Sequence, residues 1–181
     1  ILFIQMGNRG KVDKSLGAQN PIFRKKIKEL SETFSIGLHP SSVAANSLSD
    51  LQQEKAQLEE IIQKPVTQSR QHYLLTSPSL WENLQAVGIK KDFTALSADQ
   101  NGFQLGTALP VNHYDFKNEK ISDLIRVPSA WMDATGIHYQ HWNDAKMREN
   151  HQKMKEESLI FGGCWCPVYH NNYSLFLDEV N

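Results

Sequence analysis

Hydrophobic positions follow two different periods along this chain. Short apolar runs rich in β-branched and aromatic residues predict strands, and longer stretches with an apolar residue every three or four positions predict helices. Six strands are predicted, at residues 1–6, 34–39, 66–74, 92–97, 124–133 and 159–170. Four helices are predicted, at residues 21–34, 51–63, 78–87 and 141–158. Strands and helices therefore alternate over most of the chain.

Residues with capping preferences mark the ends of several of these elements. Asn20 followed by Pro21 predicts a helix N-cap and the first helical residue. Ser49, with a glutamine three residues later, predicts a capping box that opens the second helix. Gly88 predicts the end of the third helix, and Pro128 makes the fifth strand irregular or an edge strand.

The alternation favours parallel strands joined by right-handed crossovers, either as a doubly wound sheet or as a (β/α) barrel. Polar residues help to choose between them. His39 and His170 end two predicted strands, and Arg70 and His72 lie late in a third, where their spacing places them on one face. A barrel gathers reactive side chains at the carboxyl ends of many strands, whereas a doubly wound sheet focuses them at one switch point. The sequence therefore favours an α/β barrel.

Composition limits the class of protein. The 181 residues suit one domain, residues 1–181, and a net charge of −1 gives no indication of nucleic acid or an anionic membrane as partner. No apolar run approaches the roughly 20 residues of a membrane span. The start, ILFIQMGNRG, does not resemble a signal peptide, which favours the cytoplasm. It also lacks an initiator Met and begins inside a predicted strand, so the chain is expected to be a fragment.

Several other polar groups have ordinary interpretations. Cys164 and Cys166 are interpreted as two small buried residues on one strand face, because neighbours at this spacing are badly placed to form a disulfide. His138, His141 and His151 are interpreted as a solvated helix face. The GNRG segment lacks the Lys-Ser/Thr ending of a phosphate-binding loop, so a turn is predicted.

Five segments together resemble a known family. IGLHPSS, SRQHYL, GIKKDFTALSADQNGFQLGT, VPSAWMD and GGCWCPVYHNN occur in the order and at the spacing of motifs in the polysaccharide deacetylases, the NodB-homology domain of carbohydrate esterases. The resemblance covers nearly the whole chain and is closest to a divergent branch associated with surface-polysaccharide genes. It implies a distorted (β/α) barrel that holds one divalent metal, usually zinc. The family hydrolyses N-acetyl groups of amino sugars, or O-acetyl groups in some members.

The resemblance also implies metal ligands. His39 falls at the family's second motif, but the usual partner four residues later is Val43. His72 stands where the third motif has proline, and the missing ligand is inferred to have moved there. Arg70 is expected to orient the catalytic carboxylate, and the backbone N–H near Tyr73 to help hold the oxyanion.

Catalytic and substrate-binding residues follow from the later motifs. His170 matches the histidine of the last motif and is expected to give a proton to the departing amine. Asp92 resembles the fourth motif and is expected to be catalytic, with Asp133 as another candidate carboxylate. The side chains expected to line a glycan groove are Tyr73, Phe93, Tyr169 and Asn171, with Trp165 beside them.

One motif of the family has no counterpart. Its first motif carries two aspartates after the first barrel strand, one as the base and one as a metal ligand, whereas ILFIQM resembles the second strand. The chain is therefore expected to lack the first strand and these aspartates, and to have little deacetylase activity alone. If nothing covers them, the first and last predicted strands would each expose an unpaired edge, which is an aggregation hazard.

Three functions remain open from the sequence. The first is a metal-dependent hydrolase that removes acetyl groups from an amino-sugar polysaccharide or glycan precursor, for which Arg70 and His170 argue. The second is a catalytically inactive relative with a glycan-binding or structural role, which the departures at Val43, His72 and Gln104 favour. The third is an unrelated metallohydrolase on a barrel, with ligands at other strand ends. Sugar, acyl group and oligomeric state stay open.

Overall fold

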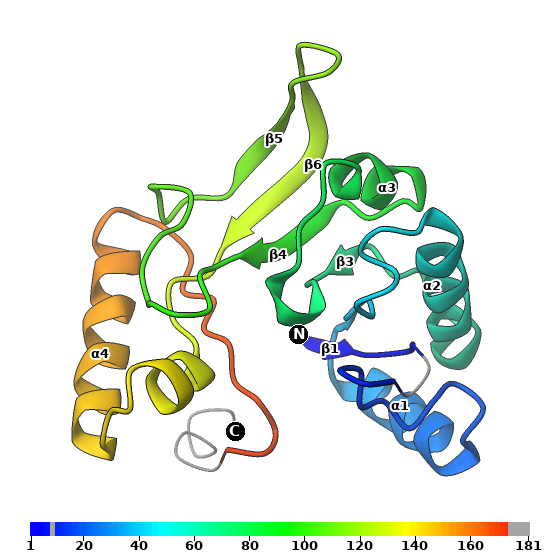
Figure 1. The fold of residues 1–181 in the computed structure, drawn as a ribbon, viewed down its shortest axis with the longest axis horizontal. Helices are drawn as coiled ribbons and strands as arrows, with labels where there is room; N and C mark the ends of the chain where they lie inside the picture. Colours follow the sequence, from blue (N-terminus) through cyan, green and yellow to red (C-terminus); the bar gives the residue numbers. More distant parts are fainter. Residues whose placement is uncertain (8–9, 174–181) are drawn as a thin grey trace. The chain divides into compact units, whose positions relative to one another are not determined.

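The computed structural model describes residues 1–7 and 10–173, with strands and helices in alternation over its first half (Figure 1). The strands are β1 (Leu2–Ile4), β2 (Ile36–Leu38), β3 (Gln68–Ser69), β4 (Lys91–Ala95), β5 (Val111–Asp115) and β6 (Lys120–Pro128). The helices are α1 (Pro21–Thr33), α2 (Leu48–Ile62), α3 (Leu80–Ala86) and α4 (Asp144–Ile160). A 3₁₀ turn, η1 (His72–Leu74), and a π-helical turn, η2 (Thr135–Tyr139), complete the regular structure of the described residues.

The strands form one sheet in the order β1-β2-β3-β4-β6-β5. β1 to β4 pair in parallel, as the alternation of strands and helices predicts. Within the described part of the chain, β1 and β5 end this order, so the sheet there is open rather than closed into a barrel. The predicted α/β class is confirmed.

The first two helices begin where polar caps bind their free backbone N–H groups. The Asn20 side chain accepts hydrogen bonds from the N–H groups of Ile22 and Phe23 at 3.0 and 3.1 Å, as predicted. The predicted cap of α2 was wrong. Ser47, with an extended backbone, accepts from the N–H of Asp50 at 3.3 Å, and Ser49 lies inside the helix. Ser47 and Ser49 lie two residues apart, and either could serve as an N-cap by sequence alone.

The third predicted strand is mostly a turn. β3 holds only Gln68 and Ser69, and the chain then enters η1, where Tyr73 has a φ of 55°. Left-handed backbone cannot continue a strand. Arg70 and His72 therefore do not share a strand face, and this expectation from the sequence was wrong.

The last predicted strands were also corrected. The sequence analysis missed β5. A turn joins β5 to β6 as a hairpin, and in this turn the Asp115 side chain accepts hydrogen bonds from the N–H groups of Lys117 and Asn118. β6 is not an edge strand, because β5 lies outside it, and Pro128 is its last residue. Residues 159–170 are not a strand. α4 continues to Ile160, and one bridge links Val168 to Met132.

The chain divides into two compact units, each with its own core. The first comprises residues 1–93 and 112–125, and the second comprises residues 94–111 and those from 126 onward. Buried aliphatic side chains such as Leu38, Leu51 and Leu58 fill the first core, whereas Trp131 and Met147 centre the second. The prediction of a single domain stays a prediction. None of the helices in the described residues is long and apolar enough to cross a bilayer.

Candidate active site

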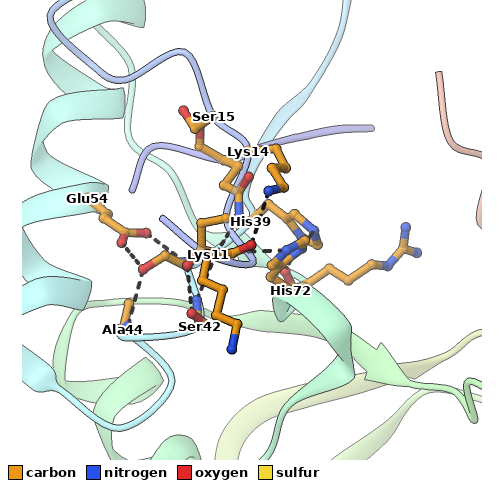
Figure 2. Close-up of polar contacts among 12 residues, drawn as sticks. Lys11, Lys14, Ser15, His39, Ser42, Ala44, Glu54 and His72 are labelled. Atoms are coloured by element: carbon orange, nitrogen blue, oxygen red, sulfur yellow. Dashed lines mark hydrogen bonds and ion pairs between the residues drawn. The ribbon is translucent and has the colours of Figure 1, made fainter. Parts of the chain in front are cut away.

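Three loops that follow parallel strands carry the candidate site of the first unit. The loop after β1 holds Asp13, the loop after β2 begins with His39, and the turn after β3 begins with His72. Because the strands are parallel, their carboxyl ends meet at one edge of the sheet. Figure 2 shows His39 and His72 next to each other there.

The two predicted metal ligands are in contact. Nδ1 of His39 lies 2.6 Å from the carbonyl oxygen of Arg70, and Nε2 of His39 lies 3.1 Å from Nδ1 of His72. A carbonyl oxygen only accepts, so His39 carries its proton on Nδ1 and presents a lone pair on Nε2. His72 then donates from Nδ1. The structure places the two histidines in contact, and their role as metal ligands stays a prediction.

Asp13 is the site residue that the sequence analysis missed. Its carboxylate is 4% exposed and lies 3.8 Å from Nε2 of His72. It accepts hydrogen bonds from the Gln5 amide at 2.7 Å and from the Ser42 N–H and hydroxyl at 3.1 and 2.6 Å. The carboxylate therefore lies near the ring nitrogen of His72 that does not contact His39. One signal for Asp13 was available in the sequence. It follows the first predicted strand, just as the two histidines follow or end later strands, and parallel strands bring such positions to the same edge of a sheet.

Arg70 lies over aromatic rings. Its guanidinium carbon is 4.6 Å from the ring centroid of Phe3 and 6.0 Å from that of Phe93, and its Nε donates to the carbonyl oxygen of Phe93 at 3.2 Å. Phe93 is 6% exposed and packs against Phe3 at 5.4 Å, so it supports Arg70 from the interior. The expected substrate contact of Phe93 would need this ring to become accessible.

The other predicted residues of this unit divide between interior and surface. Asp92 is fully buried, and its carboxylate accepts from the Ser69 hydroxyl at 3.1 Å. Tyr73 is 61% exposed, with its ring 4.3 Å from that of His72. Tyr73 is therefore the accessible aromatic side chain beside the histidine pair.

The second unit holds a separate acid–base pair. Nδ1 of His170 lies 2.6 Å from the Asp133 carboxylate, which also accepts from the backbone N–H of His170 at 2.6 Å. Asp133 is 2% exposed, whereas the His170 side chain is 43% exposed. The buried carboxylate thus fixes the ring and leaves Nε2 to exchange protons, the geometry of a general acid or base. Asp133 is thus the carboxylate that partners His170.

Nearby histidines correct one expectation. His151 is 3% exposed and lies 2.7 Å from the Tyr169 hydroxyl, so the predicted solvated face was wrong at this position. Tyr169 packs with Trp165 against the second core, and Asn171 is exposed. His138 is hydrogen-bonded to the hydroxyl of Tyr173. Cys164 and Cys166, expected to be buried, are partly exposed.

Comparison with known proteins decides the family. Residues 19–163 match the WbmS-like polysaccharide deacetylases. The chain belongs to this family. The resemblance predicted from the motifs is therefore confirmed. The match includes His39, His72 and Asp133, whereas Asp13 and His170 lie outside it. None of the curated proteins matches the chain.

A solved structure is similar to this chain. It comes from Bordetella bronchiseptica and is described as a candidate polysaccharide deacetylase involved in O-antigen biosynthesis. The identity is 17%, the TM-score is 0.46, and the match covers 78% of this chain and 51% of that one. This chain thus spans about half the length of that relative.

The family implies a metal, and the donor set can be tested for it. Two nitrogen ligands of a tetrahedral zinc ion stand about 3.3 Å apart, close to the 3.1 Å between the two ring nitrogens. Two histidines and a carboxylate are also a ligand set of catalytic zinc. In residues 1–7 and 10–173, however, no three His, Cys, Asp or Glu side chains are grouped to hold a metal as they stand. Asp13 faces the far nitrogen of His72. The types of donor atom therefore fit zinc, but the three side chains do not point to one common position in this structure.

Proposed function

We propose that this chain carries the metal-binding half of a deacetylase that removes acetyl groups from an amino-sugar polysaccharide or a glycan precursor. Membership in the family makes the reaction class the first choice. The observation that carries the proposal is that three loops, each following a parallel strand, bring Asp13, His39 and His72 to one edge of the sheet.

The residues have chemically distinct parts in this proposal. His39 would bind through Nε2, since the Arg70 carbonyl holds the proton on Nδ1, the outer contact typical of metal-bound histidines. His72 would be the second nitrogen ligand and Asp13 the acidic one. When bound, a divalent ion, preferably zinc, would polarise the acyl oxygen and lower the pKa of water. Tyr73 would pack on a sugar ring with its exposed face.

His170 is the proposed proton donor to the departing amine. Asp133 accepts from Nδ1 of His170 and so reserves Nε2 for the transfer. The roles proposed for Arg70 and Asp92 rest on the family's motifs alone. Phe93, Tyr169 and Asn171 keep their proposed place as substrate contacts on the same ground.

A second candidate function is a catalytically inactive relative that binds glycan. Val43, at the place of the family's usual second histidine, is 60% exposed and offers no ligand atom. The lack of a converged group of three donors in the described residues argues the same way.

Metal binding and turnover separate the two candidates. Zinc affinity is measured by calorimetry, and acetate release from an acetylated chitooligosaccharide is measured with added zinc or cobalt. The deacetylase predicts metal binding that is lost in H39A, together with acetate release. Glycan binding without affinity for zinc would identify the inactive relative. Zinc binding without acetate release by residues 1–181, but with release by a longer form, would show that turnover needs residues outside 1–181.

A further inference from the structure

Glu54 is a buried carboxylate that neither the sequence analysis nor the proposed reaction uses. It lies on α2 three residues after Leu51 and four before Leu58, on the stripe that faces the first core, and it is 5% exposed. Burial is the main cause that raises the pKa of Glu54 above its ordinary value. An aliphatic side chain would fill this position without that cost. The carboxylate therefore needs an explanation in its contacts.

Within the described residues, the hydrogen bonds of Glu54 go to one serine, Ser41. The backbone N–H of Ser41 donates to Glu54 at 2.9 Å, and the Ser41 hydroxyl donates to its other oxygen. The Ser41 hydroxyl in turn accepts from the N–H of Ala44 at 3.3 Å. Glu54 thus fixes the start of the loop that follows β2.

The next residue repeats the pattern with the site carboxylate. Ser42 donates its N–H and its hydroxyl to Asp13. Adjacent serines therefore each bind one carboxylate through the same two groups, and Glu54 and His39 appear on opposite sides of Ser42 in Figure 2. A displacement of Ser41 must move Ser42, because one peptide bond joins them.

The chain after β1 is packed against the same pair. A Cβ atom at Gly7 would lie 2.4 Å from Cβ of Ser41 and 2.7 Å from Oε1 of Glu54. Such distances are too short for non-bonded atoms, so only glycine lets the two segments approach this closely. The loop that leads to Asp13 and the loop that begins with His39 are thus held together on the Glu54 side.

We propose that Glu54 is a positioning residue for Asp13, acting through the adjacent serines Ser41 and Ser42. The role of Asp13 in metal binding rests on the proposed function. The arrangement of the loop by Glu54 does not, and the two can be tested apart.

The first test needs no metal. In the E54Q variant the amide keeps the size of the side chain but has only one acceptor atom, so one of the two Ser41 donors loses its acceptor. Hydrogen exchange of the Ser42 amide, followed by NMR, should become about 10-fold faster, the effect of a loss of about 1.4 kcal/mol in local stability. The matched control is E59Q on the same helix, whose carboxylate binds Lys55 and the N–H of Val66. Unchanged exchange at Ser42 in E54Q would overturn the proposal.

The second test separates positioning from general stability. E54Q should weaken zinc binding about 10-fold, within the range for outer partners of metal ligands, and should cause no further loss in a D13N background. An equal loss in both backgrounds would show that Glu54 does not act through Asp13 and would overturn the proposal. If the unmodified chain binds no zinc, the proposed function fails and the exchange measurement still decides the arrangement. S41A, which removes only the hydroxyl, replaces E54Q if that variant does not fold.

Discussion

His39 in the first unit and His170 in the second make similar contacts at Nδ1 but have different proposed roles. Each has an oxygen 2.6 Å from Nδ1, but the oxygen belongs to the Arg70 carbonyl for His39 and to the Asp133 carboxylate for His170. A carbonyl holds a proton on Nδ1, so that Nε2 is the nitrogen that can offer a lone pair to a cation. A carboxylate can hold an imidazolium while a proton is transferred. The partner of a histidine, more than its place at a strand end, therefore indicates its role.

The largest effect that tests the different roles proposed for His39 and His170 is expected when the His170–Asp133 pair is removed. H170A should lower turnover by about 10²–10⁴, the usual contribution of a general acid or base, and leave zinc affinity unchanged. D133N should lower turnover as well, because the amide no longer fixes the ring as a carboxylate does. Turnover is measured as acetate release, and zinc affinity by calorimetry.

His138 offers a control for this prediction in the same unit. It is hydrogen-bonded to Tyr173 rather than to a carboxylate, so H138A should affect turnover much less than H170A does. Similar losses in the two variants would show that the Asp133 contact does not distinguish His170.

The next test sharpens the other side of the comparison. Replacement of His72 by alanine should weaken zinc binding at least about 100-fold, since outer partners alone contribute about 10–100-fold. D13N should act in the same direction, because the carboxylate faces His72. H141A, an exposed histidine on the second unit, is the control and should leave the affinity unchanged. Unchanged affinity in H72A would return His72 to a structural role.

Sequence patterns predicted the parallel part of the fold best. The β1-to-β4 region follows apolar runs separated by amphipathic helices, and the Asn20 cap was found because it depends on neighbouring residues alone. The turn at Tyr73 and the hairpin closed by Asp115 were missed, because backbone turns depend on a few polar contacts that do not change the apolar pattern. Residues 159–170 looked like a strand because they are rich in apolar and aromatic residues, but the first two of them close α4 and only Val168 forms a bridge.

The site was predicted in part for the same kind of reason. His39, His72 and His170 stand out as histidines near strand ends, and the motifs of the family point to them. Asp13 was missed because it lies nine residues after β1 ends, in a loop with no periodic pattern. Its partner Ser42 comes from 29 residues further along the chain. Contacts of this separation depend on how the strands pair, which local patterns do not encode.

The smallest expected effect concerns stability and pH in the first unit. Burial raises the pKa of Glu54 above its ordinary value of 4.5. Between pH 4.5 and the raised pKa, Glu54 therefore binds more protons in the folded state than in the unfolded state. The free energy of unfolding should therefore fall as the pH rises from 4.5 toward the raised pKa, with a slope of at most about 1.4 kcal/mol per pH unit for a single group. E54Q cannot titrate and should lose this part of the slope, whereas E59Q should keep it. Urea denaturation between pH 4.5 and 7 measures the difference. Parallel curves for the wild-type chain and E54Q would mean that Glu54 stays ionised in its buried place, with Ser41 compensating for burial.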